Sequence, residues 1–519
     1  MTFRRVGGCV PTLLSRDKCA TLPYMATVFP LPQSIMTSAD QLEDDHLHEE
    51  CGVFGAYGSE SAAALVALGL HALQHRGQEA AGISSFDGQS FHSHRALGHV
   101  AGNFDSDAVI RRLPGAQAIG HNRYSTTGET ALRNVQPLYA ELAGGGVAVS
   151  HNGNLSNALT LRRELVQRGS IFQSTSDTEV FIHLVATSRA RTLTDRLIDA
   201  LRAVEGAYSL AVLTTEGMFG VRDPLGVRPL VLGRLGEAYI LASETVGLDV
   251  VGATFERAID PGEIVHIGPH GLTSIRPVRA VRPRPCIFEH VYFSRPDSIV
   301  DGDSVYGVRK RIGAELSRES PVVADLVVRV PVSGTPAGLG FALASGIPFE
   351  LGIIRSHYVG RTFIQPGDGV RNLGVKLKHN ANRPLIEGKR LVLVDDSIVR
   401  GTTSLKIVTM LREAGAAEVH MRIASPPTRH SCFYGVDTPE RAKLLAAQMD
   451  VAAMAEFIKA DSLAFLSIDG LYRALGEPGR FVDAPTRCDA CFTGDYPTRL
   501  TDQEEADPFD QLPLLEHVV

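Results

Sequence analysis

Residues 391–404 read Leu-Val-Leu-Val-Asp-Asp-Ser-Ile-Val-Arg-Gly-Thr-Thr-Ser, and this pattern decides the fold of the C-terminal half. The apolar run is typical of a buried strand, and it ends on the adjacent acids Asp395 and Asp396. Gly401 and the three hydroxyl residues after it are expected to begin a helix, whose first backbone N–H groups can hold a phosphate. Ligands bind at the carboxyl ends of parallel strands, so the stretch predicts a phosphate site beside two carboxylates. These acids can hold ribose hydroxyls directly or through Mg²⁺.

The sequence around this stretch alternates between strand and helix patterns. Strands are expected at 326–332, 348–354, 390–394 and 419–424, with helices at 338–345 and 404–414. This alternation predicts a parallel sheet covered by helices on both faces. Residues 276–298, with four prolines, are expected to join it to an N-terminal half of stacked antiparallel sheets. Helices flanking those sheets are expected at 59–74, 177–187 and 194–204, with Ser59 and Thr194 as N-caps.

The stretch 391–404 resembles the phosphoribosyl pyrophosphate (PRPP) binding motif of type I phosphoribosyltransferases. The resemblance implies that the helix start holds the 5′-phosphate and that the two acids hold the ribose and one Mg²⁺ per subunit. Residues 330–338 resemble the family's pyrophosphate loop, where Ser333 would reach the Mg²⁺ and Val332 replaces the usual acid. Residues 355–383 resemble its lid, which would bring Arg361, Lys376, Lys378 and Arg383 to the pyrophosphate. The implied PRPP-binding residues are Asp395, Asp396, Ser397, Arg400, Gly401, Thr402, Thr403, Ser404 and Arg361.

Cys51 begins an apolar run in the N-terminal half, and four polar motifs follow it along the chain. They are Arg-Gly-Gln-Glu at 76–79, His-Asn-Arg-Tyr-Ser-Thr at 121–126, His-Asn-Gly-Asn at 151–154 and Ser-Asp-Thr-Glu at 176–179. A lone cysteine at the start of a strand is usually a small buried apolar residue. The five features together resemble the class II glutamine amidotransferases, a branch of the N-terminal nucleophile hydrolases.

This resemblance implies a role for five residues. Cys51 would attack the glutamine carboxamide as a thiolate. Asn152, through its side chain, and Gly153, through its backbone N–H, would form the oxyanion hole. Arg123 would bind the α-carboxylate of glutamine, and Asp177 would bind its α-ammonium. Cys51 is internal, so its α-amino group can act as a base only after removal of a propeptide, residues 1–50.

Seven scattered cysteines do not suggest a disulfide framework. Cys488 and Cys491 form a Cys-x-x-Cys pair, which is compatible with zinc, an iron–sulfur cluster or a redox couple. The contexts of this pair, of Cys286 and of Cys432 resemble the iron–sulfur-containing amidotransferases. That resemblance implies that the four cysteines hold one 4Fe–4S cluster per subunit.

The composition is that of a soluble globular protein, with 44% hydrophobic and 21% charged residues. A net charge of −7 provides no global positive field for nucleic acid, and no apolar run is long enough to predict a membrane helix. We expect a cytoplasmic protein whose partners are small molecules and copies of itself. The expected domains are a propeptide at 1–50, a glutaminase domain at 51–280, a phosphoribosyltransferase domain with cluster-binding segments at 281–500 and an acidic tail at 501–519.

The two signatures together resemble the glutamine PRPP amidotransferases. This implies an N-terminal nucleophile hydrolase αββα sandwich followed by a type I phosphoribosyltransferase parallel-sheet domain. The implied reaction converts glutamine and PRPP to 5-phosphoribosylamine, glutamate and pyrophosphate, the first committed step of de novo purine (IMP) synthesis. A homotetramer and feedback inhibition by purine nucleotides are further implications.

Two other functions fit parts of the sequence. Another class II amidotransferase would carry an ATP-pyrophosphatase or sugar-isomerase half, and residues 390–404 argue against both. A PRPP-sensing regulator would carry a nucleic-acid-binding region and no glutaminase, contrary to Cys51 and the charge of −7.

Overall fold

The computed structural model describes residues 48–49, 51–124, 131–277, 281–356 and 379–504. All of them belong to one compact unit, Asp45–Val519. No helix in these ranges is long and apolar enough to cross a membrane.

Two antiparallel sheets form the N-terminal half. The first has the order β12-β10-β11-β2-β5-β3-β4, and the second has the order β14-β13-β9-β8-β7-β6. The strands of the first sheet are β2 (Gly52–Tyr57), β3 (Ala80–Phe86), β4 (Phe91–Leu97), β5 (Gln117–Arg123), β10 (Val231–Leu235), β11 (Ala238–Ala242) and β12 (Thr254–Ala258). Those of the second are β6 (Leu138–Leu142), β7 (Gly145–Leu155), β8 (Gly206–Thr214), β9 (Gly217–Arg222), β13 (Ile264–Gly268) and β14 (Gly271–Ile275).

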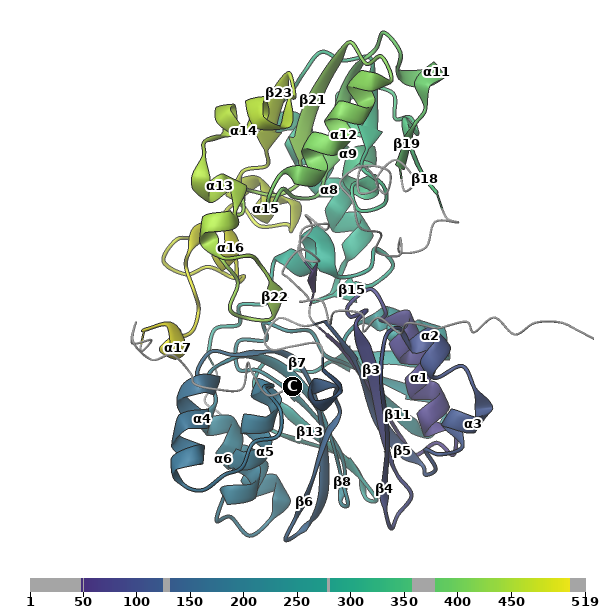
Figure 1. Ribbon diagram of the computed structural model, residues 1–519, viewed down its shortest axis with the longest axis vertical. Helices are drawn as coiled ribbons and strands as arrows, with labels where there is room; N and C mark the ends of the chain where they lie inside the picture. Colours follow the sequence, from purple (N-terminus) through teal and green to yellow (C-terminus); the bar gives the residue numbers. More distant parts are fainter. Residues whose placement is uncertain (1–47, 50, 125–130, 278–280, 357–378, 505–519) are drawn as a thin grey trace, which may run out of the picture. The chain divides into compact units, whose positions relative to one another are not determined.

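The two sheets pack face to face, and helices cover their outer faces. Val53 and Ile119 of the first sheet meet Ala211 and Met218 of the second in one buried cluster. The first sheet is covered by α1 (Ala62–Ala72) and α7 (Thr245–Val251), with the short α2 (Val100–Asn103) and α3 (Asp107–Ile110) beside them. The second is covered by α4 (Ala158–Gln167), α5 (Asp177–Thr187) and α6 (Leu193–Ala203) (Figure 1). The expected αββα sandwich is confirmed.

Two expected helix starts in this half were wrong. α1 begins at Ala62 with Ser61 as its N-cap, and Ser59 accepts a hydrogen bond from the Ser61 N–H before the helix starts. α6 is capped by Thr192, whose hydroxyl accepts the Asp195 N–H at 3.1 Å. A capping side chain bonds to the backbone three residues on, so Asp195 at N3 makes Thr192, and not Thr194, the cap.

A four-stranded parallel sheet, in the order β17-β20-β21-β23, forms the C-terminal half. Its strands are β17 (Leu326–Arg329), β20 (Arg390–Asp395), β21 (Glu418–Ile423) and β23 (Ser462–Phe465). Val392 and Val394 face α8 (Val305–Glu319) and α9 (Thr335–Ser345), whereas Leu391 and Leu393 face α12 (Thr402–Glu413) and α14 (Val451–Ile458). This alternation of side chains in β20 confirms a sheet covered on both faces.

The strand expected at 348–354 is largely absent. Phe349 makes one parallel bridge to Val327, and the chain then turns away beside Gly352. A Cβ on Gly352 would lie 2.7 Å from the Val328 side chain, so the backbone passes close over β17. β18 (Ile353–Arg355) instead pairs antiparallel with β19 (His379–Ala381).

Short segments connect regions that are distant in the sequence. The segment that contains Cys286 includes a π-helix at Glu289–Phe293, and Cys286 bridges to Cys488. The first residues of the predicted acidic tail form α17 (Thr501–Glu504). The Asp502 carboxylate there accepts the N–H groups of Leu159 and Thr160 at the start of α4.

Candidate active sites and the cysteine cluster

The predicted nucleophile immediately precedes β2, a central strand of the first sheet. Cys51 is buried, and the next residue, Gly52, pairs with Asn122 on β5. At the same end of β5, His121 Nε2 lies 3.0 Å from the His151 carbonyl oxygen on β7. Burial lowers the pKa of His121 to about 3, so its ring is neutral at physiological pH. The contact between β5 and β7 brings residues 121–124 and residues 151–154, from two of the motifs, to the same end of the sandwich.

The two predicted oxyanion-hole residues lie in β7. Asn152 is fully buried, and neither polar atom of its side chain has a hydrogen-bond partner among the described residues. Because an unsatisfied buried amide is costly, it indicates a polar group supplied by a ligand or water. Gly153 has a φ of 139°, and a Cβ there would lie 2.0 Å from the Ala207 carbonyl oxygen. Only glycine fits this position.

The residues predicted to bind the two charged groups of glutamine are connected through Asn134. Arg123 donates to the Asn134 carbonyl oxygen at 3.1 Å, and the Asn134 side chain donates to the Thr175 hydroxyl at 2.9 Å. Asp177 follows at the start of α5 and accepts the Leu155 N–H at 3.0 Å. Sequence reasoning missed Asn134, because an asparagine outside the four motifs carries no signal of its own.

The charge of Asp177 is maintained in spite of its burial. Burial by itself raises the pKa of this carboxyl, but nearby His151 and the backbone N–H groups of Leu155 and Thr178 outweigh it. The net result is a pKa below the ordinary value, so Asp177 is ionised at neutral pH. A cavity of about 290 Å³ lies beside it, lined by residues that include Asn154, Thr175, Asp177, Phe433 and Gly435.

The predicted PRPP site has the expected strand–turn–helix geometry. Asp395 and Asp396 are buried at the carboxyl end of β20, and Asp396 Oδ2 has no hydrogen-bond partner among the described residues. Ser397 donates its hydroxyl proton to Asp396 Oδ1 at 2.6 Å. Gly401, with a φ of 78°, is the N-cap of α12. Its N-terminal backbone N–H groups can therefore hold a phosphate beside the two acids.

The turn that contains Ser333 packs against the same strand end. Val330 donates its N–H to the Val394 carbonyl oxygen at 2.9 Å, and a Cβ on Gly334 would lie 2.5 Å from that oxygen. Ser333 is half-buried and lies between Val330 and Gly334 in the sequence. The contacts of these two residues hold the turn beside Val394, the residue that precedes Asp395.

Of the four cations predicted for the lid, only Arg383 lies in the described residues. Arg361, Lys376 and Lys378 lie outside the described residues. Arg383 is exposed and donates to the Glu413 carbonyl oxygen at 3.0 Å, at the C-terminal end of α12. Arg383 thus lies at the opposite end of α12 from the expected phosphate site, and its role in the lid stays a prediction.

The four predicted cluster cysteines line one small cavity. Cys286, Cys432, Cys488 and Cys491 surround it together with apolar side chains such as Val227 and Phe288. Burial raises the pKa of the Cys286 thiol to about 12, and it also raises the pKa values of Cys488 and Cys491. In the described ranges, no three His, Cys, Asp or Glu side chains converge on one metal ion. The four thiols therefore line a cavity and are not placed to bind a single ion.

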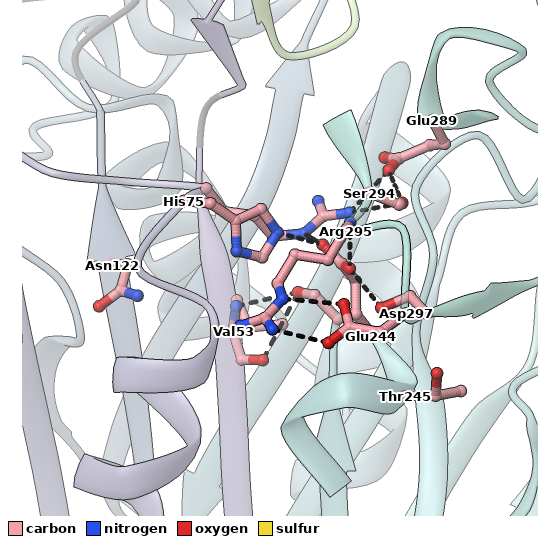
Figure 2. Close-up of polar contacts among 12 residues, drawn as sticks. Val53, His75, Asn122, Glu244, Thr245, Glu289, Ser294, Arg295 and Asp297 are labelled. Carbon is pink, nitrogen blue, oxygen red and sulfur yellow. Dashed lines mark hydrogen bonds and ion pairs between the residues drawn. The ribbon is translucent and has the colours of Figure 1, made fainter. Parts of the chain in front are cut away.

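A buried ionic network, which sequence reasoning missed, lies between the glutaminase half and the Cys286 segment. Arg76 bonds to Glu244 and, at 2.6 Å, to Glu289, while Arg228 bonds to Glu289 at 3.2 Å. Figure 2 shows the polar contacts around Glu244 and Glu289, including those of His75 and Ser294. Both arginines are fully buried. Single charged residues far apart in the sequence gave no signal of this pairing.

Replacing Arg76 should destabilise the protein strongly. Arg76→Met leaves the buried carboxylates of Glu244 and Glu289 with less compensating charge, which costs about 3–5 kcal/mol. We expect the melting temperature, followed by circular dichroism, to fall by several degrees. Arg111→Met, which breaks the exposed pair with Asp107, is the matched control and should change it little. Equal melting temperatures for the two variants would contradict this role of the network.

The chain is similar to known proteins over most of its length. A family model described as a glutamine amidotransferase domain matches residues 121–249. An amidophosphoribosyltransferase of Rhizobium etli is 58% identical over 482 residues, which cover 92% of this chain and 97% of that protein. The amidophosphoribosyltransferase of Bacillus subtilis is 48% identical over 456 residues, covering 88% of this chain and 95% of that protein.

The solved structures lead to the same family. The glutamine PRPP amidotransferase from B. subtilis, complexed with ADP and GMP, has a TM-score of 0.82 and 47% identity, covering 87% of this chain and 98% of that one. The fold and the site thus define a glutamine amidotransferase joined to a parallel-sheet transferase half. The chain belongs to the amidophosphoribosyltransferase family.

Proposed function

We propose that this protein transfers the amide nitrogen of glutamine to C1 of PRPP, giving 5-phosphoribosylamine, glutamate and pyrophosphate. This is the first committed step of purine synthesis. One chain carries both sites and matches amidophosphoribosyltransferases over most of its length. The Asn152 amide, buried and without a hydrogen-bond partner among the described residues, lies in β7 at the end of the sandwich where Cys51 precedes β2. The Asp395–Asp396 pair precedes α12. The test is product formation from PRPP with glutamine and, separately, with ammonia as the nitrogen donor.

In the glutamine half-reaction, the Cys51 thiolate attacks the carboxamide carbon. The α-amino group of a mature N-terminal Cys51, with a pKa near ~8, accepts the thiol proton and passes it to the departing ammonia. The Asn152 side chain and the Gly153 N–H stabilise the oxyanion. Arg123 and Asp177 hold the α-carboxylate and the α-ammonium of glutamine, so the carboxamide is directed at the thiol. Water then hydrolyses the thioester to glutamate.

This mechanism requires removal of the residues that precede Cys51. Cys51 has a φ of 150°, a region that residues other than glycine rarely adopt. The strained torsion is about the N–Cα bond of Cys51, next to the peptide bond that must break, which supports self-catalysed cleavage by the Cys51 thiol. N-terminal sequencing of the purified protein should therefore begin at Cys51.

In the transfer half-reaction, the backbone at Gly401–Thr403 holds the 5′-phosphate. Asp395 and Asp396 would hold the ribose hydroxyls and Mg²⁺, and Ser333 would add a hydroxyl ligand. Carboxylate and hydroxyl oxygens are the ligands that Mg²⁺ prefers, and the open Oδ2 of Asp396 fits such a group. When bound, Mg²⁺ neutralises charge on the pyrophosphate leaving group. Arg400 and Ser404 belong to the same segment, and Arg361 would complete the site.

We propose that Cys286, Cys432, Cys488 and Cys491 hold a 4Fe–4S cluster. Four thiols around one apolar cavity support this, because a cubane is bound by four thiolates at its corners. The raised thiol pKa values mean that cluster binding must release protons. When bound, the cluster crosslinks the Cys286 segment, the transferase half and the C-terminal segment.

Protein purified without oxygen should be brown and contain about four irons per chain. Cys488→Ser should lose the colour and much of the folded yield, as measured by absorbance and iron analysis. Cys51→Ser is the matched control and should keep the full iron content, since Cys51 does not line the cavity. Stoichiometric zinc in place of iron would show the cluster assignment to be wrong.

We propose a cytoplasmic homotetramer inhibited by purine nucleotides. The B. subtilis structure complexed with ADP and GMP supports nucleotide regulation. Gel filtration and inhibition assays with purine nucleotides would test these proposals.

A further inference from the structure

Gly435 contacts the strand of the oxyanion hole directly. Its φ is 101°, and a Cβ on it would lie 2.8 Å from Gly153 Cα and 3.0 Å from the Gly153 carbonyl carbon. Both partners are backbone atoms, so no flexible side chain can move to make room. Two glycines that are far apart in the sequence therefore allow two backbones to touch at the position where the Gly153 N–H is needed.

Hydrogen bonds fix the residues on the N-terminal side of Gly435. Asn154 Nδ2, next to Gly153, donates to the Phe433 carbonyl oxygen at 3.0 Å. Arg228 Nε donates to the Tyr434 carbonyl oxygen at 2.8 Å. The Arg228 carbonyl oxygen in turn accepts the Ser209 hydroxyl at 3.1 Å, and Ser209 pairs with Asn152.

The residues that follow Gly435 pair with the chain just before the nucleophile. β22 (Val436–Asp437) pairs antiparallel with β1 (His48–Glu49), with Glu49 opposite Val436. The 433–437 segment thus contacts the oxyanion strand, and before cleavage it also pairs with the residues that precede Cys51. The contacts with Gly153 and Asn154 do not involve residues 1–50, so in the mature chain the segment can still set the position of the Gly153 N–H.

We propose that the 433–437 segment of the transferase half is a positioning element of the glutamine site, with Gly435 and Asn154 as its key residues. The proposal rests on the oxyanion roles proposed above for Asn152 and Gly153. Gly435 acts through its backbone contact with Gly153. Asn154 acts through its hydrogen bond to the Phe433 carbonyl oxygen, which holds the segment in place. The glutamine site is therefore complete only when this segment is in place.

The test is the kinetics of Gly435→Ala, using only chains shown by intact-mass measurement to begin at Cys51. The added methyl group must displace Gly153, so kcat with glutamine should fall by about tenfold to a hundredfold, less than the roughly 10²–10³-fold loss when an oxyanion donor is removed outright. The KM for glutamine should stay within about twofold, because Arg123 and Asp177 are untouched. Activity with ammonia should be unchanged. Asn154→Ala should show the same split with a smaller loss.

Matched controls separate this role from general damage. Gly476→Ala introduces an alanine at a similar φ of 86°, with no atom within 4 Å, and should leave both activities unchanged. Asn103→Ala removes a half-buried side chain that also donates to backbone carbonyls, and it should leave both activities unchanged. Equal losses with glutamine and ammonia in Gly435→Ala, or no loss with either, would overturn the proposal. Full glutamine activity in Asn152→Ala would instead refute the oxyanion role on which it rests.

Discussion

Cys51→Ser is expected to lower glutamine-dependent formation of phosphoribosylamine by more than about a thousandfold, while ammonia-dependent formation persists. The hydroxyl is a far weaker nucleophile than the thiolate, whereas added ammonia bypasses the glutamine half-reaction entirely. The same substitution should block removal of residues 1–50, because the cleavage uses the same atom. Parallel assays with the two nitrogen donors and an intact-mass measurement check all three outcomes.

The control for this prediction is a cysteine that the chemistry does not use. Cys491→Ser should damage the cluster and the folded yield, and it should lower both activities together per milligram of protein. Normal glutamine-dependent turnover by Cys51→Ser would show that Cys51 is not the nucleophile.

Asp395→Asn and Asp396→Asn should each lower PRPP turnover by about a hundredfold or more with either nitrogen donor. Each substitution keeps the shape of the side chain but removes a charge where Mg²⁺ and ribose oxygens would meet. Hydrolysis of glutamine without PRPP should continue at its basal rate, because the glutamine site is unchanged. Pyrophosphate release and glutamate formation, measured separately, distinguish the two half-reactions.

Asp325→Asn is the matched control for the acid pair. Asp325 precedes β17 at the opposite end of the same sheet, where it pairs with Arg390. Its loss should leave PRPP turnover nearly normal. Unchanged PRPP affinity in both the Asp395 and Asp396 variants would show that the acid pair is part of a turn and does not bind PRPP.

The parts of the structure that could be predicted are those with local signals. β20, its two acids and α12 follow from one continuous stretch of sequence, and α5 has the predicted bounds Asp177–Thr187. The strand expected at 348–354 failed because its pairing depends on where Gly352 passes over Val328, which no local pattern encodes.

The residues that sequence reasoning missed act through long-range contacts. Arg76, Glu244 and Glu289 are ordinary charged residues until the fold buries them together. Gly435 is one of 50 glycines, and its contact with Gly153 exists only after both halves of the chain have folded. The left-handed φ values of both glycines could be suspected from sequence, but their contact could not.

The most direct test of the proposed function is the stoichiometry of the reaction with glutamine as the sole nitrogen donor. Purified protein, with Mg²⁺ present, should release one pyrophosphate and form one glutamate for each PRPP consumed. The amide nitrogen of ¹⁵N-labelled glutamine should be recovered in the trapped phosphoribosylamine. Glutamate formation that stays at the basal rate when PRPP is added, with no consumption of PRPP, or PRPP consumption without transfer of the label, would contradict the account.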